Sequence, residues 1–245
     1  MARKRGGSMA AILVYHSVAV DVVDSQLQVH PDTILRHLDW CAKEGYEAAP
    51  LLDTLADSTR KRVAITFDDG FASFQLAWPT LRARGIRPTI LVCPGRVGGE
   101  NDWASPGRVR GRLLDAPEIR KLAGEGVALG CHGWDHRPFV GRTVPDMEED
   151  LSRCEKWFET TLELRPAVFA WPFGQFTEAA IRVVARHHEY ALAAGTGRDE
   201  EPTRWTVPRI EAYEGSGAAA FEEKLDLGSF FLELARDRPG ARTGS

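Results

Sequence analysis

Short apolar runs alternate with segments of helical periodicity along most of this sequence. The runs are four to six residues long and rich in Val, Ile, Leu and Ala, which is typical of parallel strands covered on both faces. They predict strands at residues 11–16, 62–67, 88–93, 127–130, 167–171 and 190–194. Helical spacing that ends near Gly or Pro predicts helices at residues 31–45, 73–85, 117–124, 146–162, 177–187 and 219–235.

This alternation favours an α/β fold with a parallel sheet. Roughly seven repeats of the strand–helix unit are more than a simple open sheet needs, so a closed or nearly closed barrel is expected. A chain of 245 residues has the usual size of one such barrel. We predict one domain over residues 9–236, with a flexible extension at residues 1–8 and a flexible tail at residues 237–245.

Charge, cysteine spacing and hydropathy argue against a nucleic-acid-binding protein, a disulfide-stabilised protein and a membrane-spanning protein. A net charge of -4 and a pI near 6.0 provide no broad basic surface, so nucleic acid is not an expected partner. The four cysteines form no C-x-x-C pair, which fits a reducing compartment better than a disulfide framework. The basic start is followed by a short apolar run that ends at His16, and no stretch approaches the ~20 apolar residues of a membrane span. The expected location is cytoplasmic.

Several polar residues stand where the predicted strands end. In parallel barrels the carboxyl ends of the strands carry the catalytic groups. His16, Asp68, Asp69, His132 and Pro172 all fall at such junctions. The aperiodic segment 95–113, rich in Gly, Arg and Pro, is expected to be a long surface loop of the kind that often borders a site.

The two aspartates follow a predicted buried strand directly. On a continuing strand Asp68 and Asp69 would point to opposite faces. Gly70 permits a sharp turn, so both carboxylates can face one cavity. An isolated Asp-Asp-Gly tripeptide is more often a solvated turn than part of a functional site. Other residues are therefore needed to distinguish these two interpretations.

The histidine pair supplies that context. His132 and His136 are four residues apart, a spacing that places two imidazoles on one side of a helical turn and lets them bind one metal ion. Surface or capping histidines are the competing interpretation. Two neutral histidines and one carboxylate suit zinc with an open position for water, and cobalt, nickel or iron are chemical alternatives. The second aspartate is then available as a general base.

Together these segments resemble the polysaccharide deacetylase family, also called the NodB-homology domain or carbohydrate esterase family 4. Its members hydrolyse N-acetyl groups of amino sugars in glycans. Thr66-Phe-Asp-Asp-Gly70 is similar to the first family motif, which implies Asp68 as base and Asp69 as metal ligand. His132-x-x-x-His136 resembles the second, which implies both histidines as ligands. The resemblance covers most of the chain and implies a distorted (β/α)7 barrel with a metal at the carboxyl ends of the strands.

The segment Phe169-Ala-Trp-Pro-Phe-Gly174 is similar to the third family motif, whose aromatic residue and proline line the acyl pocket. This implies Trp171 and Pro172 as substrate-binding residues and the backbone N–H of Phe173 as an oxyanion donor. Trp134 is a further candidate for stacking on a sugar ring. Trp103 is not included, because large aromatic residues usually pack in the protein interior.

Two positions depart from the family pattern. The third motif often has an arginine where this chain has Ala170, and Arg209 is the predicted substitute in the cavity. The C-terminal Leu-x-His, which supplies the general acid, is not found, since no histidine follows His188. Leu13-Val-Tyr-His16 resembles the subset that carries this histidine on an N-terminal strand, which implies His16 as the acid. A buried histidine satisfied by backbone groups is the alternative.

The leading hypothesis is therefore metal-dependent removal of N-acetyl groups from an N-acetylated saccharide. A second hypothesis is a carbohydrate-binding scaffold with weak or no turnover, motivated by Ala170 and the missing C-terminal histidine. A third is hydrolysis of another C–N bond, such as a formamide or a non-sugar amide.

Overall fold

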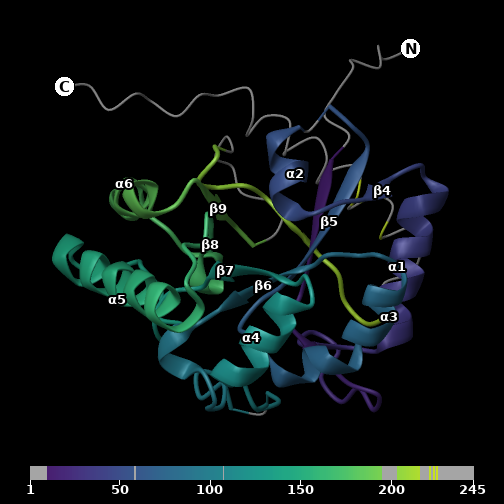
Figure 1. Ribbon diagram of the computed structural model, residues 1–245, viewed down its shortest axis with the longest axis horizontal. Helices are drawn as coiled ribbons and strands as arrows, with labels where there is room; N and C mark the ends of the chain where they lie inside the picture. The colour runs from purple at the N-terminus through teal and green to yellow at the C-terminus, as the bar shows by residue number, and fades with distance from the viewer. Residues whose placement is uncertain are drawn as a thin grey trace.

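The apolar runs form the strands of one curved parallel sheet (Figure 1). The computed structural model describes residues 10–57, 59–106, 108–194 and 203–215, together with residues 221, 223 and 225. The strands of this sheet are β1 (Ala11–Tyr15), β4 (Glu47–Ala48), β5 (Arg62–Phe67), β6 (Thr89–Val92), β7 (Ala128–Cys131), β8 (Val168–Ala170), β9 (Tyr190–Leu192) and β10 (Ile210–Glu211). The predicted extension 1–8, the tail 237–245 and most of the predicted helix 219–235 lie outside the described residues.

The sheet closes on itself through one short segment of the chain. Its strand order is β10-β1-β5-β6-β7-β8-β9, and β4 also pairs with β5. Val207 pairs in parallel with Leu192 of β9, and three residues later Ile210 pairs in parallel with Leu13 of β1. Residues 207–211 thus join the two edges, and the prediction of a distorted parallel barrel is confirmed.

Helices cover the outside of this barrel (Figure 1). They are α1 (Pro31–Lys43), α2 (Leu51–Ala56), α3 (Trp78–Ala83), α4 (Ala116–Gly124), α5 (Val144–Leu162) and α6 (Glu178–His187). Segment 73–85, predicted as one helix, is a 3₁₀ turn (Ala72–Leu76) followed by α3, because Pro79 has no N–H and begins a new helix. Among the described residues, no helix combines the length and the apolar character of a bilayer span.

The two faces of β1, β5, β6, β8 and β9 pack into two separate cores. Along β1, Leu13 belongs to a large cluster shared with the helices, whereas Ile12 belongs to a smaller one. The smaller cluster draws residues from strands all round the ring, and Leu51 and Leu55 of α2 belong to it. This alternation follows from the period of two along a strand, and it fills the barrel interior with side chains, so the cavity described below lies at a barrel end.

The sequence patterns missed the shortest elements. Strands β2 (Ser17–Val18) and β3 (Gln28–Val29) pair with each other outside the main sheet, and β4 and β10 are equally short. Two residues are too few to show a period of two. Helix α2 has only six residues and was missed as well.

Gly130 of β7 provides a test of the barrel packing. A Cβ at this position would lie 2.3 Å from Leu91 Cδ1 and 3.0 Å from the carbonyl oxygen of Val168 on the neighbouring strand. We expect Gly130→Ala to lower the free energy of unfolding, measured by urea denaturation, by about 1–3 kcal/mol. In the control, Gly124→Ala on α4, the new Cβ would meet nothing within 4 Å and should leave stability unchanged or raised. Equal stabilities for the two variants would contradict this packing.

Candidate functional site

A cavity of about 370 Å³ lies at the carboxyl ends of the strands. Eight of the ten predicted site residues line it: His16, Asp68, Asp69, His132, His136, Trp171, Phe173 and Arg209. Pro172 and Trp134 are not among the described residues that line this cavity. Pro172 is buried beside it, and the ring of Trp134 lies against Gly95 and under the guanidinium of Arg153. Most of the residues predicted from the sequence therefore lie in one cavity.

The turn after β5 brings both aspartates to the cavity. Asp69 (φ 70°) and Gly70 (φ 77°) both have left-handed backbones, so the turn uses an unusual conformation at the aspartate as well as at the glycine. Aspartate tolerates this region better than most residues. Both Asp68 and Asp69 are 4% exposed. Two buried carboxylates side by side require separate positive partners.

The two histidines do not share a helical turn, contrary to the interpretation of their spacing. His132 directly follows β7, and His136 lies in the loop before α5 with a left-handed backbone, φ 59°. The loop is held from α5, where Asp150 accepts hydrogen bonds from the N–H of Trp134 (2.8 Å) and from Arg142 (2.8 Å). The loop rather than a helix thus brings the imidazoles together.

Asp69, His132 and His136 form a group whose donor atoms all lie within 4.8 Å of one another. Asp69 Oδ1 is 3.4 Å from His132 Nε2 and 3.1 Å from His136 Nε2. Two ligand atoms bound to one tetrahedral zinc ion at about 2.0–2.1 Å each are about 3.3 Å apart. The distances from Asp69 Oδ1 to the two imidazole nitrogens therefore match those expected around one metal ion.

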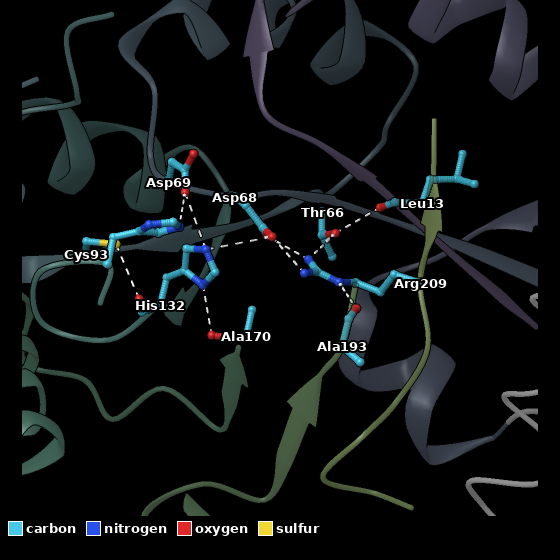
Figure 2. Close-up of polar contacts among 10 residues, drawn as sticks. Leu13, Thr66, Asp68, Asp69, Cys93, His132, Ala170, Ala193 and Arg209 are labelled. Atoms are coloured by element: carbon cyan, nitrogen blue, oxygen red, sulfur yellow. Dashed lines mark hydrogen bonds and ion pairs between the residues drawn. The ribbon is translucent and has the colours of Figure 1, made fainter. Parts of the chain in front are cut away.

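The protonation of His132 agrees with this fit. Its Nδ1 lies 2.8 Å from the carbonyl oxygen of Ala170 (Figure 2). A carbonyl only accepts, so Nδ1 carries a proton, and Nε2 is the nitrogen that faces Asp69 and that the neutral ring would offer to a metal ion. Asp69 Oδ1 is itself buried without a hydrogen bond from the described residues. Burial raises the pKa of Asp69, but the neighbouring imidazoles outweigh burial and hold that pKa well below its usual range, as a metal ligand requires.

Arg209 neutralises Asp68 in the floor of the cavity. Its two terminal nitrogens donate to the two oxygens of Asp68 at 2.6 and 2.7 Å, as Figure 2 shows. Arg209 is 1% exposed and is also bonded to the carbonyl of Ala193 (3.0 Å) and to Thr66 Oγ1 (3.2 Å). Burial raises the pKa of Asp68, but the charges of Arg209 and His132 lower it below its usual value. Asp68 is therefore ionised at neutral pH.

The sheet register places His16 beside the aspartates. Tyr15, the last residue of β1, pairs in parallel with Phe67, the last residue of β5. The residues that follow them, His16 and Asp68, therefore lie next to each other at the carboxyl ends of two adjacent strands. His16 is partly exposed and lines the same cavity.

The turn after β8 forms another wall. Phe173 has a left-handed backbone (φ 55°), and the residue is 50% exposed. Gly174 follows with φ 62°, and a Cβ there would lie 2.6 Å from the Cβ of Ala194. Trp171 is buried, with Nε1 donating to the carbonyl of Trp205 (2.8 Å).

Sequence reasoning left out two aromatic residues that line the cavity, Trp103 and Tyr213, and the first of them contacts a predicted metal ligand. Trp103 lines it and stacks on the ring of His136, with centroids 4.3 Å apart and planes 18° apart. Its position in the aperiodic loop 95–113, which was expected to border a site, was the available signal.

Comparison with known proteins agrees with this geometry. The family model for polysaccharide deacetylase matches residues 56–192. The uncharacterized protein YlxY of Bacillus subtilis is 26% identical over 133 residues, which cover 54% of this chain and 34% of YlxY. The chain thus spans about a third of the length of that curated relative.

Solved structures show the same fold. A polysaccharide deacetylase of Bacillus cereus superposes with a TM-score of 0.73 at 16% identity, covering 88% of this chain and 68% of that one. The deacetylase PplD of Streptococcus pyogenes, solved with acetate, gives 0.72 at 17% identity, with coverages of 89% and 99%. IcaB of Ammonifex degensii gives 0.66 at 22% identity, with coverages of 76% and 84%.

The sequence-based assignment is thereby confirmed: the chain belongs to the polysaccharide deacetylase family.

Proposed function

We propose that this protein is a metal-dependent deacetylase that removes N-acetyl groups from amino sugars of a polysaccharide, oligosaccharide or glycoconjugate. The observation that carries the proposal is the group Asp69, His132 and His136 next to an ionised Asp68 in one cavity. Family membership supports a carbohydrate substrate.

Asp69, His132 and His136 would hold the metal ion, and zinc suits this donor set, with cobalt, nickel or iron as alternatives. When bound, such an ion supplies Lewis acidity and lowers the pKa of water to about 7. Asp68 lies 3.9 Å from His132 Nε2, close enough to serve the same reacting atoms. Its carboxylate accepts a proton from the attacking water.

The remaining steps fall to residues around the same cavity. As water adds to the acetyl carbon, the backbone N–H of Phe173 donates to the developing oxyanion. Trp171, which lines the cavity, shapes the acyl pocket, and Pro172 is buried next to it. The C–N bond then breaks, acetate leaves, and His16 donates a proton to the amine. Acetate and a free amino sugar are the products.

The two departures from the family pattern each have a counterpart in the structure. Arg209 approaches Asp68 from residues 207–211 and holds both of its oxygens, which is the orienting role that Ala170 cannot perform. His16 lines the cavity from the end of β1. Both observations favour an enzyme over a carbohydrate-binding scaffold. Comparing acetate with formate release across acylated amines separates the deacetylase from a deformylase or another amidase.

Separate roles for the neighbouring aspartates give the first test of this function. We expect Asp69→Ala to lose both stoichiometric zinc, measured by elemental analysis, and acetate release from N-acetylated chito-oligosaccharides. Asp68→Asn should keep the zinc and lower the rate by about 10²–10⁴-fold, because only the base is removed. Chelation should abolish wild-type activity and added zinc should restore it. Wild-type activity that survives chelation, or full activity in Asp69→Ala, would contradict the proposal.

Arg209→Met tests the buried ion pair. Without the guanidinium the pKa of Asp68 rises, so the fall in kcat/KM on acidification should begin at higher pH than in the wild type. The free energy of unfolding at pH 7 should drop by about 3–5 kcal/mol, because a buried carboxylate loses its partner. In a double-mutant cycle with Asp68→Asn, the double variant should lose less stability than the sum of the single variants. Additive losses and an unmoved pH profile would show that the pair has neither role.

His16→Ala tests the general acid. We expect kcat for amide substrates to fall by about 10²–10⁴-fold while zinc content stays unchanged. An aryl acetate ester, whose phenolate leaves without a proton, should be hydrolysed at a rate much closer to that of the wild type. The matched control is His30→Ala, since His30 is also partly buried but caps α1. An equal loss on amide and ester would exclude an acid role.

A further inference from the structure

The two histidines of the metal group are held in different ways. His132 has a hydrogen-bonded Nδ1, facing the carbonyl of Ala170 at 2.8 Å. His136 Nδ1 is buried and has no hydrogen-bond partner among the described residues. If Nε2 of His136 faces a metal ion, Nδ1 must carry the proton, and a ligand histidine normally donates that proton to a fixed acceptor. Something else must set the orientation of the His136 ring.

Two aromatic rings enclose His136. The indole of Trp103 covers one face, with centroids 4.3 Å apart and an interplanar angle of 18°. Phe173 meets the imidazole at 67°, with centroids 4.5 Å apart. Close ring contacts of this kind restrict rotation of the imidazole about its side-chain bonds. Because His136 lies in a loop and not on a helix or strand, the orientation of its ring depends on these contacts.

Hydrogen bonds and an ion pair fix the loop that carries Trp103. Asn101 is 2% exposed; its side chain accepts a hydrogen bond from the N–H of Gly111 (2.7 Å) and donates to the carbonyl of Val109 (3.3 Å). The neighbouring Asp102 pairs with Arg96 at 2.8 Å. These bonds tie the two residues directly before Trp103 to Arg96, Val109 and Gly111, so the indole extends toward His136 from an anchored segment.

We propose that Trp103 is a positioning residue for the metal centre: its indole holds the His136 imidazole in the ligand orientation, as the carbonyl of Ala170 does for His132. This role rests on the metal site of the proposed function. It differs from a sugar platform, because the indole face toward His136 is already covered. A platform would change the KM for the glycan, whereas a positioning residue changes the affinity for the metal.

The experiment compares zinc affinity, by competition with a chromophoric chelator, in the wild type and in Trp103→Ala, Trp103→Leu and Trp103→Phe. We expect the Ala and Leu variants to bind zinc about 10-fold more weakly, since Leu keeps apolar bulk but has no ring face. The Phe variant should bind nearly as well as the wild type. The visible spectrum of the Co²⁺-loaded protein should change in the Ala and Leu variants only. The matched control is Trp157→Ala, which removes a partly buried tryptophan of α5 whose ring contacts Phe158.

The possible outcomes distinguish a failure of the positioning role of Trp103 from a failure of the proposed metal site. Zinc affinity and Co²⁺ spectrum that are unchanged in Trp103→Ala, with a raised KM, would overturn the positioning role and leave the proposed function intact. Equal weakening in Trp157→Ala, or in all three Trp103 variants including Phe, would show a general loss of stability and also overturn it. A wild-type protein without stoichiometric metal would overturn the metal site itself and this role with it.

Discussion

Two adjacent buried carboxylates at the end of β5 are the constraint on which the rest of the site depends. Asp68 and Asp69 are almost fully removed from solvent, where like charges repel strongly and each needs its own positive partner. Arg209 neutralises the first through two hydrogen bonds. The imidazoles of His132 and His136 converge on the second. Because their partners differ, one aspartate is suited to be a base and the other a ligand.

The barrel closure and Asp68, the proposed base, are therefore linked. Arg209 lies between Val207, which pairs with β9, and Ile210, which pairs with β1. The segment that completes the ring of strands thus also delivers the guanidinium to Asp68. On the other side, the pairing of β1 with β5 sets His16 next to Asp68. The positions of a base, its orienting arginine and a candidate acid all follow from the register of neighbouring parallel strands.

Local patterns predicted those parts of the molecule that depend on local sequence. The β5 bounds were predicted without error, and the long helices within a few residues, because their apolar periods extend over enough residues. Strand-end positions identified His16, Asp68, Asp69 and His132. The contact between Arg209 and Asp68 spans 141 residues, and no local pattern encodes it. The same is true of Trp103 and His136, which meet through two irregular loops.

The central claim is that one metal ion is held by Asp69, His132 and His136 while Asp68 stays paired with Arg209. The most direct measurement is anomalous diffraction from crystals of the zinc-loaded protein at the zinc absorption edge. We predict one strong peak next to Asp69 Oδ1 and Nε2 of both histidines, with the two hydrogen bonds between Asp68 and Arg209 intact. A peak coordinated by Asp68, or no peak among these three residues, would contradict it.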